Sequence, residues 1–419
     1  MTVVHAKAAS KAPAPVRRKA GRAAVPAGAQ NTLQASIAQR YDNVALVLQG
    51  GGALGSYQAG VIQGLLDARI EPNWVAGISI GALNTAVIAG NAPEDRQAAL
   101  EGFWNTICRP AMFPALMGAL GENANALGEQ VRKSLSQLAA TRAMLEGQQG
   151  FFTPRAPAWL TMWQTMWQTP KPSEVSFYDT SALKETLLKY ADFERINKGP
   201  MRVSLGAVNV ETGNFVYFDN TRDVLLPEHF MASGALPPGF PAVEIDGQFY
   251  WDGGLVSNTP LSEVLGEMQQ QNTLVFQVDL WSAEGPLPSD LAAISERTKD
   301  IQFSSRTRMV TDQVARTQRN AVLLKELLSL IPEAKRKDNA WCAQAEALAN
   351  SGTANIIQLI YKNKSYETYC KDYEFSLDTM REHWATGLED LQASLAQREW
   401  FEVPDAATGI VTHDIHRVV

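Results

Sequence analysis

Two strand–turn–helix units in tandem constrain the fold of this chain more than any other feature. The first begins with the apolar β-type run VALVL (residues 44–48), followed by GGGALG (residues 50–55) and a helical pattern. The second begins at residues 74–78, runs into GISIG (residues 77–81) and again continues as a helical pattern. Strands that alternate with helices are typical of a parallel sheet covered by helices. The sequence therefore predicts an α/β fold with a central, mostly parallel sheet.

The turn of the second unit has the pattern of a nucleophile elbow. Gly77, Ser79 and Gly81 form a G-x-S-x-G motif between a strand and a helix. Such a turn lifts the serine hydroxyl clear of the backbone, and small flanking residues keep other side chains away from it. Ser79 is therefore the candidate nucleophile.

The glycine loop of the first unit is compatible with two functions. Gly50, Gly52 and Gly55 match the G-x-G-x-x-G spacing of dinucleotide-binding proteins. That function also needs an acidic residue at the end of the second strand, but this strand ends at Ser79, and Glu71 precedes it. A glycine loop that opens a helix equally presents backbone N–H groups to a developing oxyanion. We favour this second function.

A carboxylate on a tight turn forms the third motif. Tyr250 and Trp251 lead into Asp252, which Gly253 and Gly254 follow. Two glycines allow a backbone or a substrate to come close to the carboxylate. Such a turn is common by itself, and its interest comes from the two motifs that precede it.

Taken in order, GGGALG, GISIG and DGG, with ASGALPPGFPAV at residues 232–243, resemble the patatin-like phospholipase family. The similarity covers residues 41–285. The resemblance implies a three-layer α/β fold with a nucleophile elbow, a helical insertion and a helical C-terminal extension. It also implies that the reaction needs no metal and no cofactor.

The resemblance also implies roles for individual residues. Ser79 would be the nucleophile and Asp252 the general base of a Ser–Asp dyad. The glycine loop that would hold the oxyanion comprises Gly50, Gly51, Gly52 and Gly55. Many family members carry a basic residue just before the last glycine of this loop, where this chain has Leu54, so no cation is expected there. A carboxylate is a weaker base than imidazole at neutral pH, so we expect Asp252 to be poorly solvated, close to Ser79 and without a basic partner.

The activity implied by the resemblance is that of a serine lipid acyl hydrolase of the phospholipase A or lysophospholipase type. Such an enzyme cleaves a carboxylic ester through an acyl-enzyme, and its expected substrate is the acyl ester of a lipid. Two alternatives stay open: an esterase for short-chain esters or polyesters, and a lipid-surface or granule-associated binding protein with little turnover. The intact pair of Ser79 and Asp252 favours an enzyme.

Composition divides the chain into four parts. Residues 1–40 hold seven Lys or Arg and no acidic residue among many Ala and Pro, which predicts a disordered basic tail. Residues 41–285 are the predicted hydrolase domain, residues 286–400 a charged helical extension with one further strand expected at residues 356–361, and residues 401–419 a C-terminal tail. The basic tail suits peripheral contact with an anionic membrane or lipid surface. The acidic remainder argues against nucleic acid as a partner.

An apolar insertion at residues 109–172 interrupts the predicted hydrolase domain. Its second half places large apolar side chains at helical spacing, namely Trp159, Met162, Trp163, Met166 and Trp167. One interpretation is a lid or an acyl-contacting surface, because tryptophan suits a lipid–water boundary. The other is ordinary core packing. The sequence leaves both open.

Several features bear on location and on alternative sites. The N-terminus lacks the apolar segment of a secretory signal, and three cysteines at unrelated spacings predict no disulfide framework, so a cytoplasmic location is expected. Residues 43–66 and 72–93 lack charged side chains, but their glycines and their change from strand to helix pattern predict a buried core rather than a membrane span. His229 and His383 are expected to be structural. The oligomeric state is not readable from the sequence.

Overall fold

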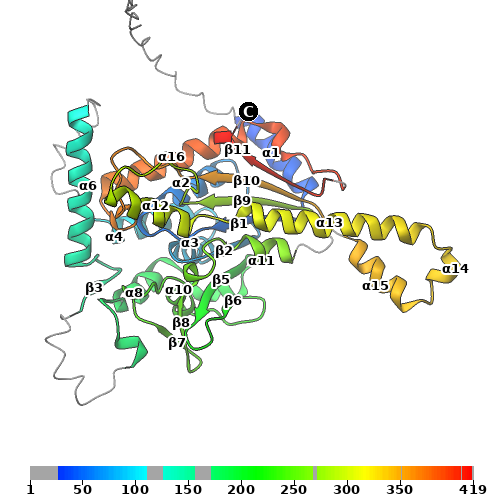
Figure 1. Ribbon diagram of the computed structural model, residues 1–419, viewed down its shortest axis with the longest axis horizontal. Coiled ribbons are helices and arrows are strands. Elements are labelled where there is room, and N and C mark those ends of the chain that lie inside the picture. Colours follow the sequence, from blue (N-terminus) through cyan, green and yellow to red (C-terminus); the bar gives the residue numbers. More distant parts are fainter. Residues whose placement is uncertain are drawn as a thin grey trace, which may run out of the picture.

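A mostly parallel sheet forms the centre of the molecule, and helices cover both of its faces (Figure 1). The computed structural model describes residues 27–110, 126–155, 171–267, 271–350, 352–406 and 408–417. The strands of the sheet are β1 (Asn43–Leu48), β2 (Trp74–Gly77), β5 (Arg202–Asn209), β6 (Phe215–Asp219), β7 (Val243–Ile245), β8 (Gln248–Asp252), β9 (Thr273–Asp279), β10 (Ala354–Ile360) and β11 (Ile410–Asp414).

Their order in this nine-stranded sheet is β11-β10-β9-β1-β2-β5-β8-β7, with β6 paired to β5. The strands from β11 to β5 all run parallel, whereas β6, β7 and β8 form antiparallel pairs. The predicted α/β fold with a mostly parallel sheet is therefore confirmed.

The two tandem units take the predicted form. β1 is followed by a short 3₁₀ turn (Gly52–Gly55) and by α2 (Ser56–Asp67). β2 is followed directly by α3 (Ile80–Ala89). Both glycine motifs therefore lie at the carboxyl ends of neighbouring parallel strands, which is where open α/β sheets bind their ligands.

Alternate side chains of β1 show why the sheet needs helices on both faces. Leu46 and Leu48 are buried in a large core with α2 and α3. Ala45 and Val47 point to the other face, where they pack with residues of α11 (Leu261–Gly266) and α13 (Thr307–Ser329). Burial of one such leucine side chain contributes roughly 2 kcal/mol. The result is the expected three-layer arrangement.

Strand β5 brings two distant motifs to one edge. Its first half pairs with β2, where Gly77 lies beside Leu205. Where β2 ends, β8 takes over the same edge, and Asp252 lies beside Ala207. Leu205 and Ala207 are two residues apart, which corresponds to roughly 7 Å along a strand. The register of β5 therefore places Asp252 just beyond the end of β2, next to the turn that carries Ser79.

The C-terminal region continues the same sheet rather than forming a separate helical unit. The strand expected at residues 356–361 is β10, which pairs with β9. The tail expected at residues 401–419 needs correction, because Ile410–Asp414 forms the edge strand β11. This strand is short and only partly buried, so its sequence lacks the clear alternation of apolar and polar residues that would predict a strand.

One long C-terminal helix packs across the first unit. It is α16 (Leu377–Leu395), which lies against α2. The hydroxyl of Tyr57 donates to Asp390 at 2.8 Å, and Trp384 Nε1 donates to Gln63 at 2.6 Å. The region after residue 286 is thus built into the body of the molecule, while α13 extends away from it with α14 (Glu333–Arg336) and α15 (Ala340–Ala349) beyond (Figure 1).

The disordered tail expected at residues 1–40 also needs correction. Residues 27–40 form helix α1, in which Leu33 and Ile37 are 6% and 3% exposed. These two side chains are four residues apart, so they share one face of the helix and pack into the main core. Residues 1–26 lie outside the described residues.

The remaining elements surround this core. They are α4 (Arg96–Ile107), α6 (Ala126–Glu146), β3 (Thr153–Pro154), β4 (Tyr178–Asp179), α8 (Ser181–Tyr190), α9 (Phe193–Lys198), α10 (Pro227–Ser233) and α12 (Leu291–Phe303). Much of the apolar insertion, including the tryptophan-rich segment 157–170, lies outside the described residues, so the lid stays a prediction. In the part of the chain that is described, no helix has the length and apolar character needed to cross a bilayer.

Candidate active site

Ser79 occupies a strained position between β2 and α3. Its backbone angles are φ 56° and ψ −125°, a region that costs a non-glycine residue about 1–3 kcal/mol. The Ser79 N–H donates to the carbonyl and the hydroxyl oxygen of Ser233, both at 3.1 Å. A methyl group on Gly77 would lie 2.5 Å from the carbonyl oxygen of Gly81, and one on Gly81 would lie 2.3 Å from that of Leu48. The two flanking glycines are therefore required by close packing of the turn.

Asp252 is buried beside this serine. Its side chain accepts a hydrogen bond from the Gly254 N–H at 2.7 Å, and it interacts with the Ser79 hydroxyl. Asp252 is 2% exposed, and burial raises the pKa of its carboxyl to about 7, although both hydrogen bonds oppose the rise. Gly253 allows the tight turn, because a methyl group there would lie 2.6 Å from the carbonyl oxygen of Gly206.

The environment of Asp252 agrees with what the sequence led us to expect. The carboxyl is poorly solvated and close to Ser79, and no ion pair among the described residues involves it. Burial without a cation favours the protonated form, so a carboxylate at this position is a stronger base than one in water. The catalytic role of the residue stays a prediction.

The glycine loop lies against the serine on one side and the C-terminal region on the other. A methyl group on Gly50 would lie 2.9 Å from Ser79 Cβ. The Gly50 carbonyl accepts hydrogen bonds from Asn258 Nδ2 at 3.0 Å and from Trp281 Nε1 at 2.8 Å. Gly51 and Gly52 line the pocket in front of Ser79. Backbone N–H groups of this loop are the natural donors to an oxyanion.

The last glycine of the loop has a packing function. A methyl group on Gly55 would lie 2.5 Å from the side chain of Ile80, so this residue allows the loop to sit on α3. The preceding Leu54 is fully buried in the core. The position where many family members carry a basic residue is therefore apolar in this chain.

A pocket that is open to solvent lies in front of Ser79 and Asp252. Aromatic side chains dominate its walls, in particular Phe151, Phe152, Phe240, Tyr373 and Phe375. Several of these rings contact one another, with Phe151 and Phe240 centroids 5.7 Å apart and Phe152 and Phe240 centroids 5.3 Å apart. Such a pocket suits an acyl chain.

Sequence reasoning did not find the residues that complete this pocket. Trp281, Phe303, Asp372, Tyr373 and Phe375 come from segments after the third motif. None belongs to a motif, and nothing in the sequence separates them from ordinary core or surface residues. Asn258, by contrast, stands close behind the DGG motif, and its position there was the available signal.

Two histidines were considered as triad candidates: His229, which precedes the DGG motif, and His383, which follows it. Neither lines the pocket. His229 Nδ1 accepts a hydrogen bond from the Leu226 N–H at 3.0 Å, at the start of α10. His383 Nε2 lies 2.7 Å from Glu367, and both side chains are buried. Both histidines therefore have structural contacts, as expected. In the described parts of the chain, no group of three or more His, Cys, Asp or Glu is arranged to hold a metal ion.

Fold and site together are of the kind found in α/β serine hydrolases, in which a strained turn presents the serine at the end of a parallel sheet. A family model described as patatin-like phospholipase matches residues 46–265, more than half of the chain. A second family model, described as patatin phospholipase, matches residues 301–407. The chain belongs to the patatin-like phospholipase family.

More distant similarities are limited in extent. The triacylglycerol lipase SDP1L of Arabidopsis thaliana is 33% identical over 67 residues, which make up 16% of this chain and 8% of that relative. The chain thus matches less than a tenth of the length of this relative. The crystal structure of VipD from Legionella pneumophila is 14% identical, with a TM-score of 0.38 over 89% of this chain and 72% of that chain. ExoU–SpcU from Pseudomonas aeruginosa is 14% identical, with a TM-score of 0.24 over 69% and 58%.

Proposed function

We propose that the protein is a serine lipid acyl hydrolase that cleaves carboxylic esters with Ser79 as nucleophile and Asp252 as general base. The observation that supports this most is the juxtaposition of a serine on a strained turn with a buried carboxylate that forms no ion pair with any of the described residues. Strain at a non-glycine residue is retained where function requires it. Family membership supports the same reaction.

The reaction proceeds in two halves. Asp252 accepts the proton of the Ser79 hydroxyl while Oγ attacks the ester carbonyl carbon, and the oxyanion that forms is held by N–H groups of the glycine loop. The tetrahedral intermediate collapses with departure of the alcohol, which takes the proton from Asp252. Asp252 then deprotonates a water molecule that attacks the acyl-enzyme. Collapse of the second intermediate releases the carboxylic acid and returns the proton to Ser79.

The charge of the pocket narrows the substrate class. Among the described residues that line it, the only charged ones are Asp252 and Asp372. The stretches 111–125 and 156–170 also lack lysine and arginine in the sequence. Asp372 is already paired with Lys299, so an anionic headgroup would meet no unpaired cation among the described lining residues. We propose an acyl ester with an uncharged or zwitterionic alcohol part, such as an acylglycerol or a phosphatidylcholine, in preference to an anionic phospholipid.

The test measures turnover and covalent labelling together. A fluorophosphonate probe, p-nitrophenyl esters of increasing chain length, and vesicles of neutral, zwitterionic and anionic lipid would be assayed with the wild type, Ser79→Ala and Asp252→Asn. Ser134→Ala is a matched control, because this serine is exposed on α6, away from the pocket.

We expect labelling and turnover in the wild type and in Ser134→Ala, and neither in Ser79→Ala. Turnover retained by Ser79→Ala would overturn the assignment of the nucleophile. A wild type that neither labels nor hydrolyses any ester, yet binds vesicles, would favour the lipid-surface binding protein instead. Maximal turnover of short soluble esters would favour the small-ester alternative.

A further inference from the structure

Trp281, which belongs to the C-terminal region, forms a hydrogen bond with the backbone of the glycine loop. This residue follows β9 and lies beyond the first family match, which ends at residue 265. The indole Nε1 of Trp281 donates to the Gly50 carbonyl at 2.8 Å, and the backbone N–H of Trp281 donates to Gln49 Oε1 at 3.0 Å. Trp281 is 3% exposed, so water does not compete for the indole hydrogen bond.

Fixing the Gly50 carbonyl also fixes the next N–H. In a trans peptide, the carbonyl oxygen of one residue and the N–H of the next point in opposite directions. Asn258 and Trp281 fix the position of the Gly50 oxygen with two hydrogen bonds. The Gly51 N–H is thereby directed to the opposite side of the same peptide, and Gly51 lines the pocket in front of Ser79.

A second contact ties the same loop to α12. The carbonyl of Phe303, the last residue of this helix, accepts hydrogen bonds from Gln49 Nε2 at 3.0 Å and from Asn258 Nδ2 at 2.8 Å. The Phe303 ring also packs on the indole of Trp281, with centroids 5.4 Å apart. The end of α12 therefore supports both donors to the Gly50 carbonyl.

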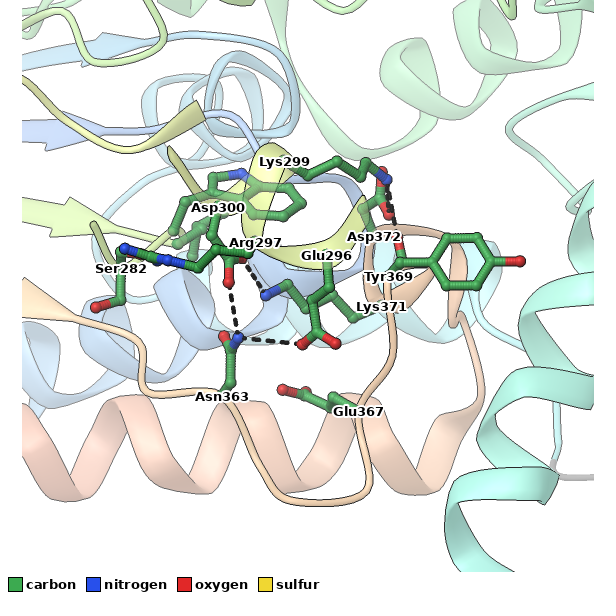
Figure 2. Close-up of polar contacts among 12 residues, drawn as sticks. Ser282, Glu296, Arg297, Lys299, Asp300, Asn363, Glu367, Tyr369, Lys371 and Asp372 are labelled. Atoms are coloured by element: carbon green, nitrogen blue, oxygen red, sulfur yellow. Dashed lines mark hydrogen bonds and ion pairs between the residues drawn. The ribbon is translucent and has the colours of Figure 1, made fainter. Parts of the chain in front are cut away.

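Figure 2 shows a buried ion pair between Lys371 and Asp300, which lies next to the indole of Trp281. Lys371 Nζ is 2.6 Å from Asp300 Oδ1, with side chains 1% and 7% exposed. The same Nζ lies 4.9 Å from the centroid of the Trp281 ring. Asn363 Nδ2 donates to the other oxygen of Asp300 at 3.3 Å, so the pair has a neutral neighbour as well. A cation over the face of a buried indole is an attractive contact that fixes the ring.

A second ion pair, nearer the pocket, links the same two segments. Lys299 Nζ is 2.7 Å and 2.8 Å from the two carboxylate oxygens of Asp372 (Figure 2). The Asp372 carbonyl occupies the space that a side chain on Gly52 would need, since a methyl group there would lie 2.3 Å from it. The turn at residues 371–373 therefore contacts both the glycine loop and the residue that supports it.

Stability alone is a weak reason to bury such an ion pair. Removing two charges from water costs about as much as their attraction returns, and apolar replacements are often neutral or stabilising. A pair that is buried against the indole which holds the Gly50 carbonyl has a more specific explanation: it fixes the direction of a hydrogen-bond donor.

We propose that Trp281, held in place by the Lys371–Asp300 pair, is a positioning residue for the oxyanion loop. It directs the Gly51 N–H towards the oxyanion, and the segments that carry Trp281, Asp300 and Lys371 are thus part of the catalytic apparatus rather than an appendage to it. This inference rests on the proposed function, because an oxyanion forms only if the protein hydrolyses esters.

The test replaces the indole donor and leaves an aromatic ring. Trp281→Phe loses the hydrogen bond to Gly50, whereas Trp384→Phe is a matched control that loses an indole hydrogen bond to Gln63 of α2, and neither Trp384 nor Gln63 lines the pocket. We would measure kcat per fluorophosphonate-labelled site, KM, and the inhibition constant of a trifluoromethyl ketone, which forms a tetrahedral adduct with serine. Loss of one hydrogen bond that positions a donor is expected to lower kcat about tenfold.

For Trp281→Phe we expect this fall in kcat with little change in KM, and an equal loss of affinity for the trifluoromethyl ketone. Trp384→Phe should match the wild type in all three. The double variant Asp300→Asn, Lys371→Met removes both charges without leaving one unpaired, and should shift the same two quantities in the same direction by about threefold. If Trp281→Phe does not fold, this double variant tests the positioning role of Trp281 instead.

Three results would overturn the inference. The first is a Trp281→Phe enzyme with the same kcat and inhibitor affinity as Trp384→Phe. The second is a Trp281→Phe enzyme whose kcat falls without any loss of affinity for the trifluoromethyl ketone. The third, if Trp281→Phe is insoluble, is a double variant with the kcat of the wild type. A wild type without ester turnover would instead refute the proposed function, so the two failures are distinguishable.

Discussion

Replacing Asp252 by Asn should make the protein more stable at neutral pH and inactive at every pH. Burial raises the pKa of the Asp252 carboxyl to about 7, against an ordinary value of 3.8. Its folded pKa thus exceeds its unfolded pKa, so the folded state holds a proton that the unfolded state releases. The stability from this proton is fully present below pH 4 and is lost as the pH rises to about 7.

The pKa difference of about 3 corresponds to about 4 kcal/mol of unfolding free energy. Asparagine resembles the protonated carboxyl at every pH, and its side-chain oxygen can still accept from the Gly254 N–H. The stability advantage of Asp252→Asn over the wild type should therefore grow with pH. About 2 kcal/mol of that growth should fall between pH 5.5 and 8.

The assay is urea denaturation of both proteins at pH 5.5 and 8, followed by tryptophan fluorescence. Other titrating groups are common to both proteins, so the difference between the two curves isolates residue 252. Wild-type kcat/KM should rise tenfold per pH unit below about 7 and then level off, because only the ionised carboxyl accepts the serine proton. A stability difference that does not change between the two pH values would refute the reasoning, as would an activity profile that levels off near pH 4.

Three further predictions concern contacts in the same region, and Gly213→Ala serves as a control for one of them. Ser79→Gly should abolish turnover yet raise the unfolding free energy by about 1 kcal/mol, because glycine relieves the strain at φ 56°; equal or lower stability in urea would contradict this. Gly52→Ala should cost at least about 2 kcal/mol and lower kcat, since its methyl group would meet the Asp372 carbonyl, whereas Gly213→Ala, also at positive φ but in open space, should cost about 1 kcal/mol and leave kcat unchanged. Lys371→Met should lower the unfolding free energy by about 3–5 kcal/mol, because the Asp300 carboxylate is left buried without its cation. If Lys371→Met lost less thermal stability than Gly213→Ala, the result would argue against a buried ion pair.

The three motifs and the apolar strands of the parallel part of the sheet could be predicted, except for β11, because each depends on neighbours in sequence. Ser79 lies between two glycines at the end of an apolar run, and Asp252 precedes two more, so short patterns were enough to find them. The strand at residues 356–361 was visible for the same reason, as an apolar run interrupted only by Gln358 that forms β10. Such signals survive without any knowledge of tertiary contacts.

The support of the glycine loop could not be predicted, because it depends on long-range contacts. Lys371 is one charge in a charged segment, and only its approach to Asp300, 71 residues earlier, buries it. Trp281 similarly looks like an ordinary residue after a strand. The helix at residues 27–40 was missed for a different reason: the average composition of residues 1–40 concealed two apolar residues, Leu33 and Ile37, at helical spacing.

The position of β9 has a consequence for synthesis of the chain. β1 pairs with β2 on one side and with β9 on the other, yet β9 is completed about 230 residues after β1. At roughly 5–20 residues per second, a nascent chain on the ribosome carries β1 with one open edge for roughly 10–45 seconds. During that interval the strand is free to pair with another nascent chain. Slow translation between residues 48 and 279 should therefore lower the yield of soluble protein.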